Sequence, residues 1–312
     1  MILAGSELAD TSAPTLSVLI CTRNRADKLK RAVESVLANS FGDFELIVVD
    51  QSTDRATENA LIAIHDVRLR YIPTDTVGVS ISRNIAIRES LANIVVFTDD
   101  DCVCAPNWLS SILSEYEAEP TALGVYGRVV PYGPPRPGMI CPCINESTKR
   151  SVLEGPAIPH IALGGGNNMS FKKEVFEKVG LFLESLGPGT WLNHAEDTEF
   201  SYRVLWSGCK LVYSPAPVVQ HDKWLDQTQF AELMKGAMRG LALVFLSYAL
   251  RFDRLAFTQL LRTGYYLARN RMAIGSARVG LGYFAMGLAL GPIYRVIRPP
   301  RFRADGGLAR LH

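Results

Sequence analysis

The sequence has no hydrophobic run of about 20 residues, the length that a simple membrane-spanning helix requires. Two uncharged apolar stretches in its C-terminal part, residues 240–250 and 279–294, fall short of that length. Residues 1–14 lack a basic start followed by a long apolar core, so we expect no signal peptide. The glycine triplet at 164–166 is not part of a P-loop motif, and no internal repeat is visible. These absences argue against a simple membrane span, a secreted precursor, a P-loop nucleotidase and a repeat array.

Cysteine is scarce, and its spacing is not that of common metal sites. The 312 residues include six cysteines. Cys102 with Cys104, and Cys141 with Cys143, form C-x-C pairs, whereas zinc sites commonly use C-x-x-C. Free thiols in a reducing cytosol are the simpler interpretation, so we expect a cytoplasmic protein.

Acidic residues are almost absent from the C-terminal part. The net charge of the whole sequence is only +2, so we expect no nucleic-acid partner. From Arg262 to His312, however, there are nine arginines, no lysine and one acid, Asp305. Anionic lipid headgroups attract such a basic segment. We therefore expect the apolar faces of residues 240–250 and 279–294 to enter the inner surface of a cell membrane; a soluble helical cap or a homodimer interface is the alternative.

The first hundred residues alternate between apolar strands and amphipathic helices. We expect strands at 16–21, 44–50, 69–72 and 94–98, and helices at 26–38, 59–65 and 79–90. Such alternation predicts an α/β fold, a mainly parallel sheet flanked by helices. Ligands bind these sheets beyond the carboxyl ends of the strands. Those ends carry Thr22–Arg25, Asp50 and Asp99–Asp101.

The remainder is predicted to extend this fold and then to become helical. We expect helices at 108–117 and 172–179 and another that starts among the acids near 196 and stops at 208; strands at 168–171, 210–214 and 218–221; and an irregular loop over 131–160. After Trp224 the pattern indicates helices with apolar faces.

Six segments of the sequence resemble glycosyltransferase family 2, whose members are inverting sugar-nucleotide transferases with the GT-A fold. They are LSVLICTRNR, ELIVVDQSTD, GVSISRN, VVFTDDDC, GGGNNMSFKKEVFEKVGLF and HAEDTEFSYRVL. Each is weak by itself, but together they follow the family's order over roughly residues 15–225. The resemblance implies a flexible tail (1–14), a nucleotide-sugar-binding half (15–105) and an acceptor or catalytic half (106–225) of one GT-A domain, followed by a helical extension (226–312).

The acidic run Asp99–Asp101 stands where that family has its D-x-D motif. The resemblance places Asp99 near the donor ribose, Asp100 in the donor site and Asp101 on a divalent metal, Mg²⁺ or Mn²⁺. A departing nucleoside diphosphate gains negative charge, which a hard cation with oxygen ligands neutralises. His221 corresponds to a histidine that related enzymes supply to the metal. A solvated acidic turn and a structural histidine are the alternatives.

The resemblance also indicates which residues hold the donor's base and diphosphate. The family's nucleobase pocket corresponds to Thr22, Arg23, Arg25 and Asp50. A uracil or guanine N–H can donate to Asp50, although an aspartate at a strand end can instead cap a turn. Arg83, in GVSISRN, is expected to place a guanidinium on the diphosphate. A solvated surface position is the alternative for each arginine.

The segment HAEDTEF resembles the family's E-D motif. By this resemblance Asp197 is the general base that takes a proton from the acceptor hydroxyl, and Glu196 binds acceptor hydroxyls or orients the site. Trp191, Asn167 and Asn168 are expected to contact the acceptor or the donor. The alternatives are that the acids only stabilise a helix N-terminus and that Trp191 belongs to the core.

The sequence therefore predicts a metal-dependent hexosyltransferase. It is expected to move a sugar from a UDP- or GDP-sugar to a hydroxyl of a carbohydrate or lipid-linked acceptor, in glycan, polysaccharide or glycolipid synthesis. A non-catalytic nucleotide-sugar-binding subunit on the same fold is the rival interpretation, and intact Asp101 and Asp197 argue against it. A retaining transferase would differ only in the stereochemistry of its product.

Overall fold

The computed structural model describes residues 13–142, 144–155, 163–250, 253–269 and 285. Cys143, the arginines from Arg271 onward and the apolar stretch 279–294, apart from Ala285, lie outside these ranges. The predictions made for them therefore stay predictions.

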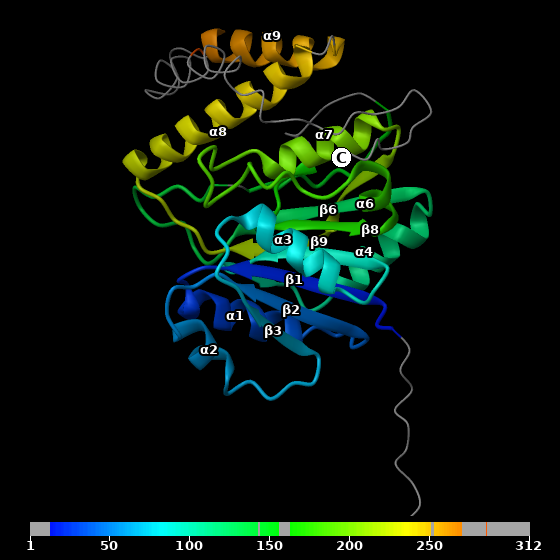
Figure 1. The fold of residues 1–312 in the computed structure, drawn as a ribbon, viewed down its shortest axis with the longest axis vertical. Coiled ribbons are helices and arrows are strands. Elements are labelled where there is room, and N and C mark those ends of the chain that lie inside the picture. Colours follow the sequence, from blue (N-terminus) through cyan, green and yellow to red (C-terminus); the bar gives the residue numbers. More distant parts are fainter. Residues whose placement is uncertain (1–12, 143, 156–162, 251–252, 270–284, 286–312) are drawn as a thin grey trace, which may run out of the picture.

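One mixed sheet of nine strands forms the centre of the molecule, in the order β3-β2-β1-β4-β8-β6-β9-β5, with β7 also paired to β9 (Figure 1). The strands are β1 (Leu16–Thr22), β2 (Phe44–Asp50), β3 (Leu69–Pro73), β4 (Ile94–Asp99), β5 (Cys102–Cys104), β6 (Ala122–Pro131), β7 (Ser151–Leu153), β8 (Asn168–Lys172) and β9 (Lys210–His221). Strands β1 to β4 are parallel to one another, as are β6 and β9, while β5, β7 and β8 run antiparallel to their neighbours. Parallel pairs contribute most of the paired residues, which confirms the predicted α/β fold.

Helices cover both faces of the sheet, each with its own apolar core. Helices α1 (Ala26–Leu37), α2 (Ala56–Leu61) and α4 (Trp108–Ala118) pack on one face. Helices α3 (Val79–Glu89), α6 (Glu174–Val179) and α7 (Glu196–Trp206) pack on the other. In α1 the buried residues recur at helical spacing, because a stripe three and four residues apart faces the sheet.

The parallel register brings the polar strand ends to one edge of the sheet. Thr22 at the end of β1 lies opposite Asp50 at the end of β2, and Cys21 lies opposite Asp99 at the end of β4. Parallel strands end on the same side, so side chains that are distant in sequence become neighbours there.

Three of the predictions made for single segments differ from the structure. The helix predicted at 59–65 is α2, Ala56–Leu61, which begins three residues earlier because the Asp54 carboxylate accepts the backbone N–H of Ala56 and Thr57 and Leu61 are the buried positions. The two strands predicted at 210–214 and 218–221 form one continuous strand, β9, whose pairing with β6 shifts register along its length. The predicted loop over 131–160 contains the short strand β7.

Strand β6 was missed because two glycines interrupt its apolar pattern. Both glycines are required by close packing. A Cβ atom at Gly127 would lie 2.2 Å from the Asn168 side chain and 2.5 Å from the Pro217 carbonyl oxygen, and one at Gly124 would lie 2.6 Å from Phe171. The residues that weaken the strand pattern are thus the ones that let β6 lie next to β8 and β9.

The C-terminal helices α8 (Gln227–Ala249) and α9 (Arg254–Arg269) lie at the end of the molecule opposite α1 and α2 (Figure 1). The capping box of Asp226 and Gln229 starts α8. A third apolar cluster buries residues 241–245 and 248 of α8 together with residues of α7, α9 and the loop before α7. The apolar stretch 240–250 therefore packs mainly inside the protein, which corrects the expectation that its apolar face enters a membrane. Among the described residues, no helix has the length and apolar character needed to cross a membrane.

Candidate active site

A cavity of about 250 Å³ opens at the carboxyl edge of the sheet. It is lined by residues from the ends of β1, β4 and β9 and from the loops after β2 and before α3 and α7: Cys21, Thr22, Arg23, Arg25, Gln51, Gly78, Val79, Asp99, Asp100, Asp101, Pro188, Gly189, His221 and Lys223. The structure thus brings seven of the predicted site residues into one cavity, which we call the donor cavity.

The three adjacent aspartates have different surroundings. Asp99 projects into the donor cavity with its side chain 40% exposed. Asp100 is buried and accepts hydrogen bonds from Thr22 Oγ1 (2.8 Å) and Arg25 Nη1 (2.9 Å). Burial raises the pKa of Asp100 to about 6 in spite of Arg25. Asp100 therefore holds the loop after β1. The same Arg25 Nη1 also donates to Asp101 Oδ2 (3.1 Å), and Asp99 is the carboxylate of the three that stays most exposed to a ligand.

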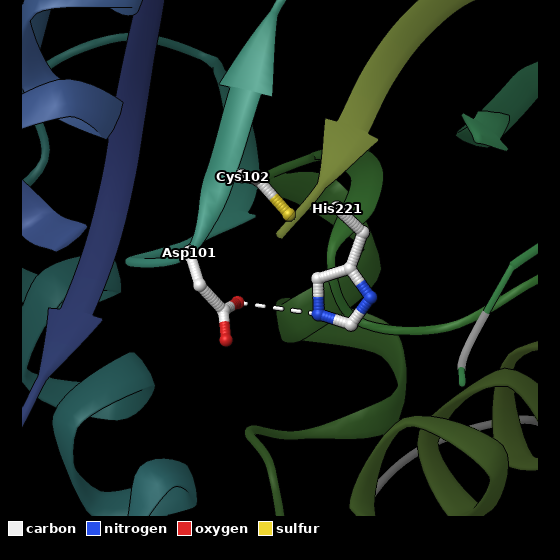
Figure 2. A group of neighbouring side chains, drawn as sticks. All are labelled: Asp101, Cys102 and His221. Atoms are coloured by element: carbon white, nitrogen blue, oxygen red, sulfur yellow. Dashed lines mark ion pairs between the residues drawn. The ribbon is translucent and has the colours of Figure 1, made fainter. Parts of the chain in front are cut away.

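Asp101 and His221 form a buried ion pair (Figure 2), and both residues line the donor cavity. Antiparallel pairing of β5 with β9 sets Cys102 opposite His221, so Asp101 comes beside the imidazole, with Oδ1 3.2 Å from Nε2. Burial opposes the charge on each group, but their mutual contact prevails: the pKa of His221 is raised to about 10 and the pKa of Asp101 is lowered. His221 Nδ1 lies 3.0 Å from the carbonyl oxygen of Pro142, which orients the ring.

These residues fit a divalent cation. Ligand atoms of Asp101, Cys102 and His221 all lie within 4.8 Å of one another. Carboxylate oxygen and imidazole nitrogen are common ligands of divalent metals, and a cation would replace the proton that now binds His221 to Asp101. The nearby Cys102 thiol is fully buried, and that burial raises its pKa well above the usual value.

A second cavity, of about 490 Å³, adjoins the first. Its polar wall contains Arg83, Asn167, His194, Glu196 and Asp197. The two cavities share Asp99, Pro188 and Lys223 in their linings. We call the second one the acceptor cavity, because the predicted catalytic carboxylates line it.

Asp197 sits in the first turn of α7 and is held by backbone N–H groups. Its Oδ2 accepts from Gly166 (2.9 Å) and its Oδ1 from Thr198 (2.7 Å). Ala195 before it has a left-handed backbone (φ 74°), which turns the chain sharply into the helix. This fixed carboxylate faces the acceptor cavity and is suited to accept a proton there.

Arg83 lies buried between two acids. Its Nη1 donates to Glu196 Oε1 (3.0 Å), its Nη2 lies 3.7 Å from Asp99 Oδ1, and its guanidinium packs over the Phe182 ring. Burial raises the pKa of Glu196 to about 7, helped by Asp197 and opposed by Arg83. A Cβ at Gly166 would lie 2.3 Å from Arg83 Nη2, so the glycine leaves room for the guanidinium. Arg83 therefore lies between Asp99, a carboxylate of the donor cavity, and Glu196 of the E-D motif.

Three predicted site residues line neither cavity. Asp50 is buried and accepts from Tyr71 Oη (2.8 Å) and the backbone N–H of Ser52 (2.9 Å), as expected of a residue that caps a turn. The Asn168 amide is used by the fold, since it accepts from Trp108 Nε1 and donates to two backbone carbonyls. Trp191 is 53% exposed, and the guanidinium of Arg239 stacks on it.

Sequence reasoning missed Gln51 and Lys223. Gln51 follows Asp50 and lines the donor cavity, where its side chain accepts from Gly78 N and donates to Thr76 Oγ1. Lys223 lines both cavities, and its positive charge acts on the carboxylates of Asp99 and Asp101. Its position two residues after His221, just beyond a strand, was the available signal.

Comparison with known proteins agrees with this geometry. The model of Glycosyl transferase family 2 matches residues 17–180, more than half of the chain, so the chain belongs to this family of transferases. A glucosyl-dolichyl phosphate glucuronosyltransferase of Haloferax volcanii is 27% identical over 227 residues, which cover 69% of this chain and 71% of that protein. A validoxylamine A glucosyltransferase of Streptomyces hygroscopicus subsp. jinggangensis is 28% identical over 41% of this chain and 32% of that protein.

Solved structures identify the fold as GT-A. The mannosyltransferase PcManGT of Pyrobaculum calidifontis, solved with GDP-Man and Mn²⁺, superposes with a TM-score of 0.58 at 19% identity, over 91% of this chain and 76% of that one. GalNAc-T7, solved with UDP, GalNAc and Mn²⁺, gives a TM-score of 0.54 at 19% identity, over 68% of this chain and 44% of that one. The family match extends only to residue 180, so α7, with Glu196 and Asp197, and the C-terminal helices lie beyond it.

Proposed function

We propose that this glycosyltransferase moves a sugar from a nucleoside-diphosphate sugar to an acceptor hydroxyl with inversion. The observation that carries the proposal is the junction of two cavities, one with Asp99 and Asp101, the other with Asp197. A direct displacement needs donor and acceptor on opposite sides of the anomeric carbon, and two adjoining cavities supply that arrangement. The relatives' sugar-transferring activities and the Mn²⁺ in the two similar structures support it.

Asp101 and His221 would hold a divalent metal, Mn²⁺ or Mg²⁺. When bound, the metal neutralises the charge that grows on the departing diphosphate. The mixed oxygen and nitrogen donors, both from buried residues that line the donor cavity, support this role. Thr22, Arg23 and Gln51 line the same cavity, where they would contact a UDP or GDP moiety. Asp99 is the exposed carboxylate there and would accept from the ribose hydroxyls.

Asp197 would act as the general base. The acceptor oxygen forms its bond to the anomeric carbon, the bond from that carbon to the phosphate oxygen breaks, and its electron pair leaves with the diphosphate. The acceptor proton passes to Asp197, whose carboxylate is already fixed by Gly166 and Thr198. Arg83 would stabilise the leaving diphosphate from its buried position beside Asp99, while Glu196 keeps the guanidinium in place.

Replacement of the base tests this proposal. Asp197→Asn should keep binding of UDP or GDP with Mn²⁺ but lower donor turnover by about 100-fold or more, because the amide cannot take the proton. Release of nucleoside diphosphate from a panel of nucleotide sugars measures turnover, and calorimetry measures binding. Exposed Asp75→Asn is the control. An Asp197→Asn variant with wild-type turnover would place the base elsewhere, and proton NMR of the product reads inversion or retention.

The proposal also covers location. The basic residues from Arg262 to Arg310 would bring the chain to the inner, anionic face of a cell membrane as a peripheral protein. The support is their charge alone.

A further inference from the structure

The acceptor cavity has an apolar wall as well as a polar one. Helix α8 contributes Phe230, Leu233, Met234, Ala237 and Leu241 to the lining. These positions are three, one, three and four residues apart, so they form one stripe along the helix. Phe230, Leu233, Met234 and Ala237 are only partly buried, and the apolar cluster at the C-terminal half of α8 does not include them.

A second apolar surface faces the same cavity. The segment after β6 contributes Ile140, Pro142 and Ile144, of which Ile140 is 36% and Ile144 is 40% exposed. What matters is their grouping, because they line one cavity together with the α8 stripe, and grouped apolar surface marks a ligand or partner site. The α8 stripe and this segment together are called the apolar slot.

The position of α8 next to the catalytic helix is fixed by close contacts. His194 precedes Asp197 by three residues, and its Nε2 lies 3.0 Å from the carbonyl oxygen of Leu233 in α8. A Cβ at Gly236 would lie 2.7 Å from His194 Nε2, and the Gly240 Cβ position is 3.1 Å from Ala195 Cβ. Because glycines let α8 approach this closely, the slot is a preformed part of the acceptor cavity.

We propose that the acceptor is amphipathic: a polar head presents the reacting hydroxyl to Asp197, and an apolar chain next to it lies in the apolar slot. This rests on the proposed function and narrows its acceptor class. A purely polar sugar would leave the slot in contact with water, whereas an attached hydrocarbon chain would bury it. The cavity of about 490 Å³ has the size of a small-molecule site.

The test uses methyl, hexyl and octyl β-glycosides of glucose, mannose and galactose, below their micellar concentrations. Their binding to the full chain is titrated by calorimetry in the presence of Mn²⁺ and UDP or GDP. For at least one sugar the affinity should rise at least about tenfold from methyl to octyl, because each fully buried methylene contributes about fourfold. Equal affinity of methyl and octyl glycosides for every sugar would overturn the proposal.

Substitutions in the apolar slot test whether the gain in affinity from methyl to octyl glycosides arises there. Phe230→Gln and Met234→Gln should each reduce the gain from methyl to octyl by about threefold or more, because they make the slot polar. Leu250→Gln is the matched control: this leucine ends the same helix, is 60% exposed and lines neither cavity. A gain that survives in both slot variants, or is lost equally in the control, contradicts the proposal.

Two further measurements distinguish an acceptor in the apolar slot from a second copy of the chain, and the acceptor proposal from the proposed function. Gel filtration that shows a dimer for the wild type and a monomer for Met234→Gln would make the slot a self-interface and overturn the proposal. Donor hydrolysis by the wild type, measured without acceptor, tests the proposed function by itself. If the donor is hydrolysed but glycoside affinity does not depend on chain length, only the proposal of an amphipathic acceptor is wrong. If the protein neither binds nor hydrolyses a donor, the transferase proposal is wrong.

Discussion

At the scale of single residues, the three aspartates Asp99–Asp101 have different contacts and different roles. Asp100 turns inward to Thr22 and Arg25 and holds the neighbouring loop, while Asp101 meets His221 and Asp99 stays open to the donor cavity. Three like charges in sequence are tolerated because cationic groups lie beside all of them: Arg25 pairs with both Asp100 and Asp101, His221 pairs with Asp101, and Arg83 lies 3.7 Å from Asp99.

Asp101→Ala should remove the metal-dependent part of nucleoside diphosphate binding. The substitution deletes the carboxylate of the proposed metal pair and leaves His221 without its partner. Calorimetric titration of UDP and GDP with and without Mn²⁺ measures it, and the affinity gained from Mn²⁺ should disappear. Asp75→Asn, on the exposed surface, serves as the control. An unchanged response to Mn²⁺ in Asp101→Ala would remove this residue from the metal site.

Lys223→Gln should weaken binding of a nucleoside diphosphate by about 10-fold to 100-fold, the range for loss of one charge-assisted hydrogen bond. The reason is its place where the two cavities meet, with its positive charge acting on Asp99 and Asp101 beside the donor cavity. Affinity for the free nucleoside should stay the same, because it carries no phosphate. Lys149→Gln on the exposed surface is the matched control. If nucleoside and nucleoside diphosphate lose affinity equally, Lys223 does not contact the phosphates.

At the scale of elements, helix α7 connects the proposed catalytic site with helices α8 and α9. Its N-terminus carries Glu196 and Asp197, and its middle carries the fully buried pair Glu199 and Arg203. Arg203 donates to Glu199 and to the backbone carbonyls of Val179 and Leu181, which secures the end of α6. Tyr248 of α8 donates to the same Glu199. The two helices therefore share one buried charge network.

Tyr248→Phe should lower the free energy of unfolding by about 1–3 kcal/mol, because a buried carboxylate loses a donor. Urea denaturation measures it. Tyr116→Phe is a matched control, since the Tyr116 hydroxyl is also buried but pairs with the neutral Ser170 hydroxyl. The control should lose about 0.5–1.5 kcal/mol. A loss for Tyr248→Phe no larger than that of the control would mean that α8 does not depend on this network.

At the scale of the whole molecule, helix α8 packs against the loop before α7 and against α7 itself. Leu241 to Tyr248 fill the apolar cluster with Leu186, Leu192 and Tyr202, and the preceding turns of α8 close the acceptor cavity. Removing residues 226–312 would therefore expose the core and open the acceptor cavity. Such a truncation cannot by itself report on membrane binding.

Two leucines of the same apolar stretch test this placement. Leu243→Ala should lower the free energy of unfolding by about 2–5 kcal/mol, since Leu243 is 1% exposed in the cluster. Leu250→Ala should cost well under 1 kcal/mol, because Leu250 is 60% exposed. Urea denaturation of both variants without lipid gives the comparison. Equal, small losses would indicate that the stretch is not packed in the protein core and would restore its assignment to a membrane surface.

The sequence by itself determined the parallel β1–β4 half, the order of the family motifs and the pairing of an acidic run with a later E-D motif. Those features are local, because strand and helix periodicity and short motifs are written in neighbouring residues. It also pointed to Asp101 with His221, and to Arg83, which the structure brings into the two adjoining cavities.

Only the tertiary structure decided what depends on contacts between distant segments. Three examples depend on which strands and helices lie beside a residue. Asp50 caps a turn, the Asn168 amide donates to carbonyls of β6 and β9, and Trp191 is exposed. The apolar residues of α8 divide between a buried cluster and an open cavity wall, although their composition along the helix is alike. Burial is a property of the packed neighbours, so a helix pattern predicts an apolar face but not whether protein, ligand or lipid covers it.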